Sequence, residues 1–261
     1  MAEKETDWEF GRDIDGLPVV RFLRGEREGR PWASLLEALA PGQAGGAAVS
    51  AADPVEFVLA SMAGWMVTCP VEFGERLRGR GAAVVRHGHS MHRDLTGDPP
   101  SVGWAAWART PLRDGFRAVP CDRDAGTMLA ACRTAFGPGH PDHRPTSDEQ
   151  LREELRRVLS GEVIGPLLPT GSLVVDDEDE VVGGLVLTDF DGVPWVAKIF
   201  RHPERSYPGL GRELLHRCLG NLAGHGRTEV GLAVTEGNPA RRLYESLGFR
   251  VTKSTLTVAV P

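Results

Sequence analysis

Residues 193–234 carry the strongest structural signal in the chain, a β-α-β unit. VPWVAKIF, at 193–200, is a short apolar run typical of a strand, and TEVGLAV, at 228–234, is a second one. Between them, apolar side chains recur at helical spacing, at Leu210, Leu214, Cys218, Leu219 and Leu222. A ligand of such a unit lies at the carboxyl ends of its strands, so this order already predicts where a site belongs.

The helix of this unit begins on a glycine-containing turn, RHPERSYPGLGRELL. Pro203 and Pro208 prevent a strand or a helix from running through the turn, and Gly209 and Gly211 lack the Cβ atom that would keep a ligand away. The first helical turn offers free backbone N–H groups at the positive end of the helix dipole, which suits a phosphate or pyrophosphate. On its own, a Gly-x-Gly pair is more often a tight turn, so the neighbouring sequence has to decide.

Two familiar phosphate sites do not fit the residues that follow. A P-loop needs Lys and then Ser or Thr after its last glycine, whereas Arg212 and Glu213 occupy those places. A dinucleotide-binding fold needs several further β-α units, and the chain ends too soon after Val234 to supply them, although Glu236 imitates the ribose-binding acid. Both nucleotide sites are therefore disfavoured.

A second motif, GNPARRLYESLGF, follows the second strand. Asn238 is a natural helix cap, Pro239 suits the first helical position and Gly248 ends the helix. Tyr244 lies at the edge of the buried stripe of this short helix, where its hydroxyl can reach a cleft. The alternative reading of Tyr244 is an amphipathic tyrosine at the edge of the core.

Together, HPERSYPGLGRELL and NPARRLYESLGF, in this order around a β-α-β unit, resemble the GNAT superfamily of acyl-CoA N-acyltransferases. The resemblance covers roughly Gly115 to the C-terminus. It implies an α/β fold with a mixed sheet and a central β-α-β cradle for acetyl-CoA or another acyl-CoA. The implied reaction is direct attack of a primary amine, carried by a small molecule or a peptide, on the thioester.

The resemblance also assigns site residues. Tyr244 falls on the general acid that protonates the departing CoA thiolate, and it is a protonated donor at neutral pH. The acyl-CoA would be bound by Ile199, Phe200 and Arg201 beside the pantetheine arm, by Ser206, Tyr207, Gly209, Leu210, Gly211 and Arg212 around the pyrophosphate, and by Asn238 and Arg241 flanking the arm.

Two departures from the family pattern keep an alternative open. Ser206 stands where the family usually has Arg or Gln, and Pro208 stands where the family has a backbone N–H donor. Arg205 is the residue we consider as a substitute in binding the acyl-CoA. The cradle strand also lacks the carboxylate base that many members carry. The candidate bases are His202, Asp189 and, in the loop FGPGHPDHRP, His140 and His143, with a water relay as a further option. This loop, residues 136–145, lies where the family often builds its acceptor pocket, so the resemblance implies that His140, Asp142 and His143 contact the substrate, and the alternative is a solvated loop. The alternative function is a non-catalytic acyl-CoA-binding or regulatory module.

The first part of the chain resembles the last. GERLRGRGAAVVRHGHSMHRDL is similar to PARRLYESLGFRVTKSTLTVAV, except that Arg78 follows Leu77 where Tyr244 follows Leu243. We therefore predict a smaller α/β half-domain over residues 1–105, which is a degenerate partial GNAT-like copy without catalytic activity. The proline-containing segment 96–115 is the predicted linker, and 115–261 the predicted catalytic domain.

Charge and composition narrow the partners. With 30 Lys+Arg against 36 Asp+Glu, the net charge of −6 argues against a nucleic-acid partner, and no apolar run is long enough to span a membrane. The four cysteines form no CxxC pair, and the histidines at 87, 89 and 92 have no matching carboxylate or Cys, so we expect no metal. A cytoplasmic protein is expected, and a homodimer stays open.

Overall fold

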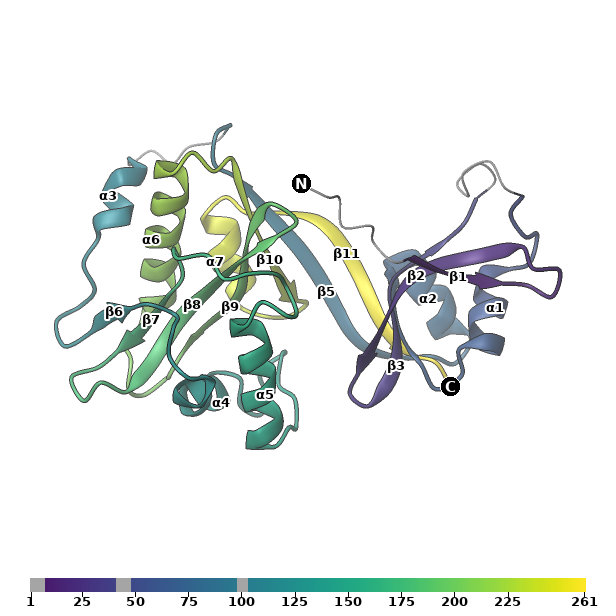
Figure 1. Cartoon of the computed structure of the whole chain (residues 1–261), viewed down its shortest axis with the longest axis horizontal. Helices are drawn as coiled ribbons and strands as arrows, with labels where there is room; N and C mark the ends of the chain where they lie inside the picture. Colours follow the sequence, from purple (N-terminus) through teal and green to yellow (C-terminus); the bar gives the residue numbers. More distant parts are fainter. Residues whose placement is uncertain (1–7, 41–47, 98–102) are drawn as a thin grey trace. The chain divides into compact units, whose positions relative to one another are not determined.

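The computed structural model of the chain describes residues 8–40, 48–97 and 103–261, which form two compact units (Figure 1). Unit 1 comprises Met1–His89 together with Lys253–Pro261, and unit 2 comprises Ser90–Thr252. Two strands continue from one unit into the other along the chain, and both are therefore counted in each unit. They are β5 (Ala83–Asp94) and β11 (Arg250–Ala259).

Unit 1 is an α/β unit built on a mixed sheet. Its further elements are β1 (Trp8–Arg12), β2 (Pro18–Arg27), β3 (Arg30–Ala38), α1 (Pro54–Ser61), β4 (Met66–Pro70) and α2 (Val71–Gly79). Strands β1, β2 and β3 pair antiparallel, β3 pairs with β4 in parallel, and β11 runs antiparallel to β4. Both helices share one apolar core with this sheet, to which Val58 and Leu77 contribute fully buried side chains.

Unit 2 is the larger unit and contains the sequence motifs described above. Its further elements are α3 (Trp104–Arg109), β6 (Arg117–Val119), η1 (Ala125–Met128), α4 (Leu129–Ala135), α5 (Asp148–Leu159), β7 (Ser172–Val175), β8 (Val181–Phe190), β9 (Val193–Arg201), α6 (Leu210–Gly224), β10 (Glu229–Thr235) and α7 (Ala240–Ser246). The strand order is β5-β10-β9-β8-β7-β6. Strands β9 and β10 are parallel with α6 between them, which confirms the predicted β-α-β unit.

Two apolar cores cover the two faces of this sheet. Helices α6 and α7 pack on one face, where Leu214, Leu215 and Phe249 are almost fully buried. Helices α4 and α5 pack on the other face, around Met128 and Leu155. The α/β class with a mixed sheet is thus as the sequence predicts. The β9–β10 pair lies within this sheet, between two helical layers.

Strand β9 contains a β-bulge at the level where its pairing with β10 ends. Opposite β8, Lys198 pairs with Val186 and Val196 pairs with Leu187, so β9 carries one extra residue, Ala197, at this point. The parallel pairing with β10 stops at the same level, since its register contains only Gly231 with Trp195 and Leu232 with Val196. Beyond the bulge, the carboxyl ends of the two strands are not paired with each other.

The segment 96–115 is more than the linker that its prolines predict. It contains α3, which packs against α6, while residues 98–102 lie outside the described part of the chain. The division between the units falls between His89 and Ser90 instead, and the last strand completes the sheet of unit 1. The last residues of the chain belong to unit 1 because β11 pairs with β4. The sequence of a strand does not reveal which strand it pairs with.

Gly220 explains how α3 approaches α6. A Cβ atom on Gly220 would lie 2.4 Å from the carbonyl oxygen of Trp104 and 2.5 Å from the backbone nitrogen of Ala108. We expect Gly220→Ala to lower the free energy of unfolding by about 1–3 kcal/mol through overpacking, measured by denaturant titration. Gly224→Ala in the same helix is the control, because a Cβ there has no neighbour within 4 Å. Equal stability of both variants would contradict this packing.

Unit 1 repeats the order of elements seen in unit 2. The series β3, α1, β4, α2, β5 has the same parallel pair, crossing helix, short helix and long strand as β9, α6, β10, α7, β11. At the position that corresponds to Tyr244, Arg78 is exposed and forms an ion pair with Glu75 at 2.6 Å. Unit 1 therefore has no tyrosine acid on its short helix.

Candidate functional site

The head of α6 is an open glycine cradle. Gly209 precedes the helix with φ of +98°, a left-handed conformation that glycine adopts without strain, and no side chain caps the helix. At Gly211, a Cβ atom would meet only the Ile199 Cδ1 atom, at 3.9 Å. The protein's own packing therefore does not require a glycine at Gly211. The N–H of Leu210 donates to the Tyr207 carbonyl at 3.4 Å, and the N–H groups of Gly211 and Arg212 stay available to an anion.

The turn that leads into the cradle is held by its own hydrogen bonds. The backbone N–H of His202 donates to the carbonyl of Val182 at 2.7 Å, and the Ser206 hydroxyl donates to the His202 carbonyl at 2.6 Å. His202 Nδ1 in turn accepts the N–H groups of Glu204 and Arg205, each at 3.2 Å. The Ser206 hydroxyl thus stabilises the turn from inside and does not face a ligand.

Three residues predicted to bind the acyl-CoA point their side chains into the core. Phe200, Tyr207 and Leu210 are each at least 95% buried. The Tyr207 hydroxyl donates to Glu213 Oε2 at 2.6 Å, and burial and this hydrogen bond raise the pKa of Tyr207 to about 12. Only the backbone of these three residues remains available to a ligand.

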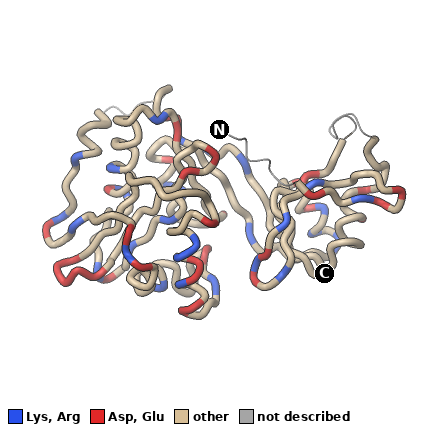
Figure 2. Tube along the Cα trace, viewed as in Figure 1, with Lys and Arg blue, Asp and Glu red and all other residues tan. Residues whose placement is uncertain are grey.

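The predicted arginines are held by neighbouring groups. Arg205 pairs with Asp176 at 2.6 Å and with Glu178 at 3.2 Å, both in the acidic turn between β7 and β8 that is red at the lower left of Figure 2. Arg241 pairs with Glu236 at 3.1 Å and with Glu245 at 2.9 Å. These carboxylates fix both guanidinium groups, so a phosphate would have to compete for them.

The other two predicted arginines make weaker contacts. Arg212 is exposed at the first turn of α6 and donates to Ser246 Oγ at 3.4 Å. Arg201, at the end of β9, donates to the carbonyl of Pro203 at 3.4 Å. Arg212 is therefore the exposed cation nearest in sequence to the open glycine cradle.

Helix α7 presents Tyr244 as the sequence predicts, but more deeply buried. Asn238 Oδ1 accepts the N–H of Ala240 at 2.9 Å, which caps the start of the helix. Tyr244 is only 5% exposed. Burial, and to a smaller extent the charge of Asp142, raises the pKa of Tyr244 to about 12. The hydroxyl therefore stays protonated at neutral pH and is able to donate a proton.

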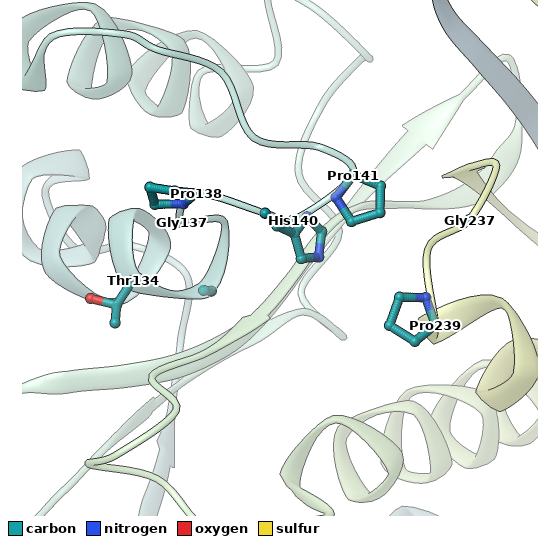
Figure 3. A pocket seen from close by; sticks show the side chains of 9 residues that line it. Thr134, Gly137, Pro138, His140, Pro141, Gly237 and Pro239 are labelled. Carbon is teal, nitrogen blue, oxygen red and sulfur yellow. The ribbon is translucent and has the colours of Figure 1, made fainter.

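A pocket of about 410 Å³ opens between two loops of unit 2 (Figure 3). One wall runs from the end of α4 through Pro138, His140 and Pro141, and the other consists of Gly237 and Pro239 between β10 and α7. The sequence indicates a substrate role for the first loop, and the structure adds the second wall. Glycine and proline make up most of the lining, so backbone atoms are exposed to whatever enters.

Asp142 joins the two walls. Its Oδ1 accepts a hydrogen bond from the Thr235 hydroxyl at the end of β10, and its Oδ2 accepts one from Asn238 Nδ2 at 2.9 Å. The sequence points to Asp142 only as a member of the substrate loop, and it does not indicate Thr235. A polar residue at the carboxyl end of a parallel strand is the signal that identifies Thr235.

The hydrogen bonds of the histidines distinguish the candidate bases. Nδ1 of His140 accepts the N–H of Asp142 at 3.0 Å, and Nδ1 of His202 also accepts, so in both neutral rings Nε2 carries the proton. Nδ1 of His143 lies 2.9 Å from the carbonyl of Phe136 and must donate, because a carbonyl oxygen only accepts. Of these three rings, only that of His143 leaves Nε2 free to accept a proton.

Asp189 lies at the wrong end of the sheet. It pairs with Pro194 at the start of β9, and its Oδ1 accepts the N–H of Gly192 in the turn at 2.7 Å. At ~3.3 Å per residue, Asp189 lies about 16 Å along the strand from the level of Ile199. It is therefore unsuited to act beside the cradle.

The burial of the two tyrosine hydroxyls can be measured directly by pH titration. The chain has only Tyr207 and Tyr244, and the pKa of each is raised to about 12. We expect tyrosinate absorbance to stay low in the native protein beyond pH 10, where the unfolded chain titrates. Because the folded state favours the protonated form, this contribution to stability is complete below pH 10 and is lost towards pH 12. Native titration near 10 would contradict the burial of both hydroxyls.

Comparison with known proteins supports the resemblance to the GNAT family. Residues 169–251 match the family model described as an acetyltransferase (GNAT) domain. A search of curated protein sequences finds no match. Within the described residues, no helix is both long and apolar enough to cross a membrane.

Solved structures share the fold. A GCN5-related N-acetyltransferase from Sphaerobacter thermophilus has a TM-score of 0.62 at 18% identity, over 98% of this chain and 81% of that one. A tandem GNAT protein from the clavulanic acid biosynthesis pathway has a TM-score of 0.61 at 15% identity, over 94% and 80%. A GCN5-related N-acetyltransferase from Kribbella flavida has a TM-score of 0.51 at 16% identity, over 93% and 87%.

These likenesses extend over both units, whereas the family model covers part of unit 2 alone. That part runs from the loop before β7 through the cradle and α7 to the start of β11. Residues 169–251 of this chain therefore form a GNAT acetyltransferase domain.

Proposed function

We propose that unit 2 is an acyl-CoA-dependent N-acetyltransferase that transfers an acyl group to a primary amine. The observation that carries the proposal is the end of the β9–β10 pairing at the bulge of β9, together with the uncapped head of α6 after β9 and the helix that bears Tyr244 after β10. A phosphate fits the free N–H groups of the cradle, and an extended arm fits between strand ends that do not pair with each other.

When bound, the acyl-CoA supplies an activated thioester carbonyl. The backbone N–H groups at Gly211 and Arg212 bind the diphosphate, and Gly211 leaves the space that this approach needs. The unpaired edge of β9 near Ile199 orients the pantetheine arm, and a backbone N–H near Phe200 stabilises the oxyanion. The buried side chains of Phe200 and Leu210 hold this backbone in place.

Tyr244 holds the proton for the departing thiolate. Its pKa of about 12 keeps the hydroxyl protonated at pH 7, so the proton is available to the sulfur as negative charge develops on it. The pocket between the two loops receives the amine. His143 belongs to the loop that forms one wall, two residues beyond Pro141, and its ring has the tautomer that can accept a proton at Nε2.

Calorimetric titration with acetyl-CoA, with NADH as the control ligand, tests the proposal. We expect saturable binding of acetyl-CoA alone, followed by CoA thiol release above the hydrolysis rate when a panel of primary amines is added. Binding without release for any amine would favour the non-catalytic acyl-CoA-binding module. Absence of binding would refute both functions.

A further inference from the structure

Asp142 makes contacts that bear on how the active site is assembled. Its loop, residues 136–145, connects α4 to α5, on the face of the sheet opposite α6 and α7. The Asp142 carboxylate nevertheless accepts hydrogen bonds from Thr235 and Asn238, which flank the turn between β10 and α7. Asp142 thus connects segments that are far apart in the sequence and belong to opposite faces of one unit.

The contact with Asn238 extends to Tyr244 through the helix. The Asn238 side chain uses its nitrogen to donate to Asp142 and its oxygen to accept the N–H of Ala240. Its amide is therefore oriented by Asp142 at one end and caps α7 at the other. Tyr244 lies one helical turn beyond Ala240, so its position depends on how this cap is held.

The same carboxylate lies beside the pocket wall. Asp142 N–H donates to His140 Nδ1 at 3.0 Å, and His140 lines the pocket opposite Pro239, as Figure 3 shows. The Asp142 side chain is 29% exposed, and each of its two oxygens accepts a hydrogen bond. Both loops that form the pocket are thus joined through one residue.

We propose that Asp142 is the positioning residue for Tyr244, fixing the 136–145 loop to the end of β10 and to the cap of α7 in one geometry. The inference rests on the proposed function for the role of Tyr244, but the contacts are independent of it. Asp142 acts through Thr235 and Asn238, and it needs no contact with the acyl-CoA or the amine.

The experiment compares Asp142→Asn with Asp148→Asn. The first variant keeps the shape of the side chain, but it removes the negative charge and one of the two accepting oxygens, so the side chain no longer accepts from both Thr235 and Asn238. Asp148 is exposed at the start of α5 and pairs with Arg133 at 2.6 Å, away from α7. The control therefore removes the same charge from the same loop–helix segment.

Two readouts that need no amine follow the change. In a Tyr207→Phe background, Tyr244 is the only tyrosine, and its ionisation is followed by tyrosinate absorbance. We expect Asp142→Asn to lower the ionisation midpoint of Tyr244, because the charge of Asp142 contributes to its raised pKa. We also expect hydrogen exchange at the first amides of α7 to become about fivefold faster through the weakened cap. Asp148→Asn should change neither.

Each outcome decides the proposal. An unchanged Tyr244 midpoint in Asp142→Asn overturns it, and so does a lowered midpoint with unchanged exchange, because the charge then acts without holding the helix. If the Tyr207→Phe background does not fold, the difference titration between the wild-type protein and Tyr244→Phe supplies the same midpoint. Acetyl-CoA binding by the wild-type protein is measured separately, so its absence would refute the proposed function and leave this test valid.

Discussion

Tyr244→Phe is expected to lower kcat by about 10²–10⁴-fold at saturating acetyl-CoA and amine, the range that a positioned general acid contributes. The substitution removes one oxygen from a side chain that is 5% exposed and otherwise packed in the core with Phe249. Among the described residues, no hydrogen-bond donor or acceptor pairs with this hydroxyl, so its loss leaves no partner unsatisfied. Steady-state kinetics with a responsive amine measures the effect.

The control for this variant is its own affinity for acetyl-CoA. Calorimetry should give the wild-type dissociation constant, because the cradle at Gly211 contains no atom of Tyr244. A fall in kcat with intact affinity identifies an interaction made only in the transition state. Undiminished kcat would remove Tyr244 from the mechanism, and reduced affinity would mean that the hydroxyl binds the cofactor instead.

The sequence predicts the local elements of unit 2 because each has its own signal. Leu210, Leu214 and Cys218 recur at helical spacing, and all three side chains are buried as that spacing requires. Asn238 and Gly248 mark the ends of the short helix for reasons of backbone geometry alone. The cradle and the tyrosine helix were therefore predictable from residues close together in the chain.

The tertiary features were not predictable in the same way. Asp142 meets Thr235 across 93 positions of sequence, and no local pattern relates them. Likewise, β11 has the alternation of an ordinary strand whether it completes the sheet of one unit or of the other, so its pairing with β4 is invisible in the sequence.

The bulge at Ala197 is a further case. The pairing of β9 with β10 ends at its level, yet VPWVAKIF contains no glycine that would mark a bulge. The side chains of Phe200 and Tyr207 illustrate the same limit. A motif predicts that their backbone lies at the cradle, but only the fold determines that both side chains face the core.

Gly211→Leu is expected to weaken acetyl-CoA binding by more than about 100-fold without lowering stability. In the free protein, the new Cβ meets only Ile199 Cδ1 at 3.9 Å, and exchanging Gly for Leu in a helix gains up to about 1 kcal/mol in propensity. Denaturant titration should therefore give an equal or higher free energy of unfolding, while calorimetry shows the loss of binding.

This opposition between stability and binding makes Gly211 a sharper test than Gly209. At Gly209 the φ of +98° strains any other residue, so a loss of binding there has two explanations. Gly224→Leu, at the opposite end of α6, supplies the matched control, because its Cβ meets nothing within 4 Å and no ligand is expected there. If Gly211→Leu binds acetyl-CoA as tightly as Gly224→Leu does, the cradle is not where the diphosphate binds. If only Gly211→Leu loses acetyl-CoA binding, the glycine at this position serves the close approach of the ligand.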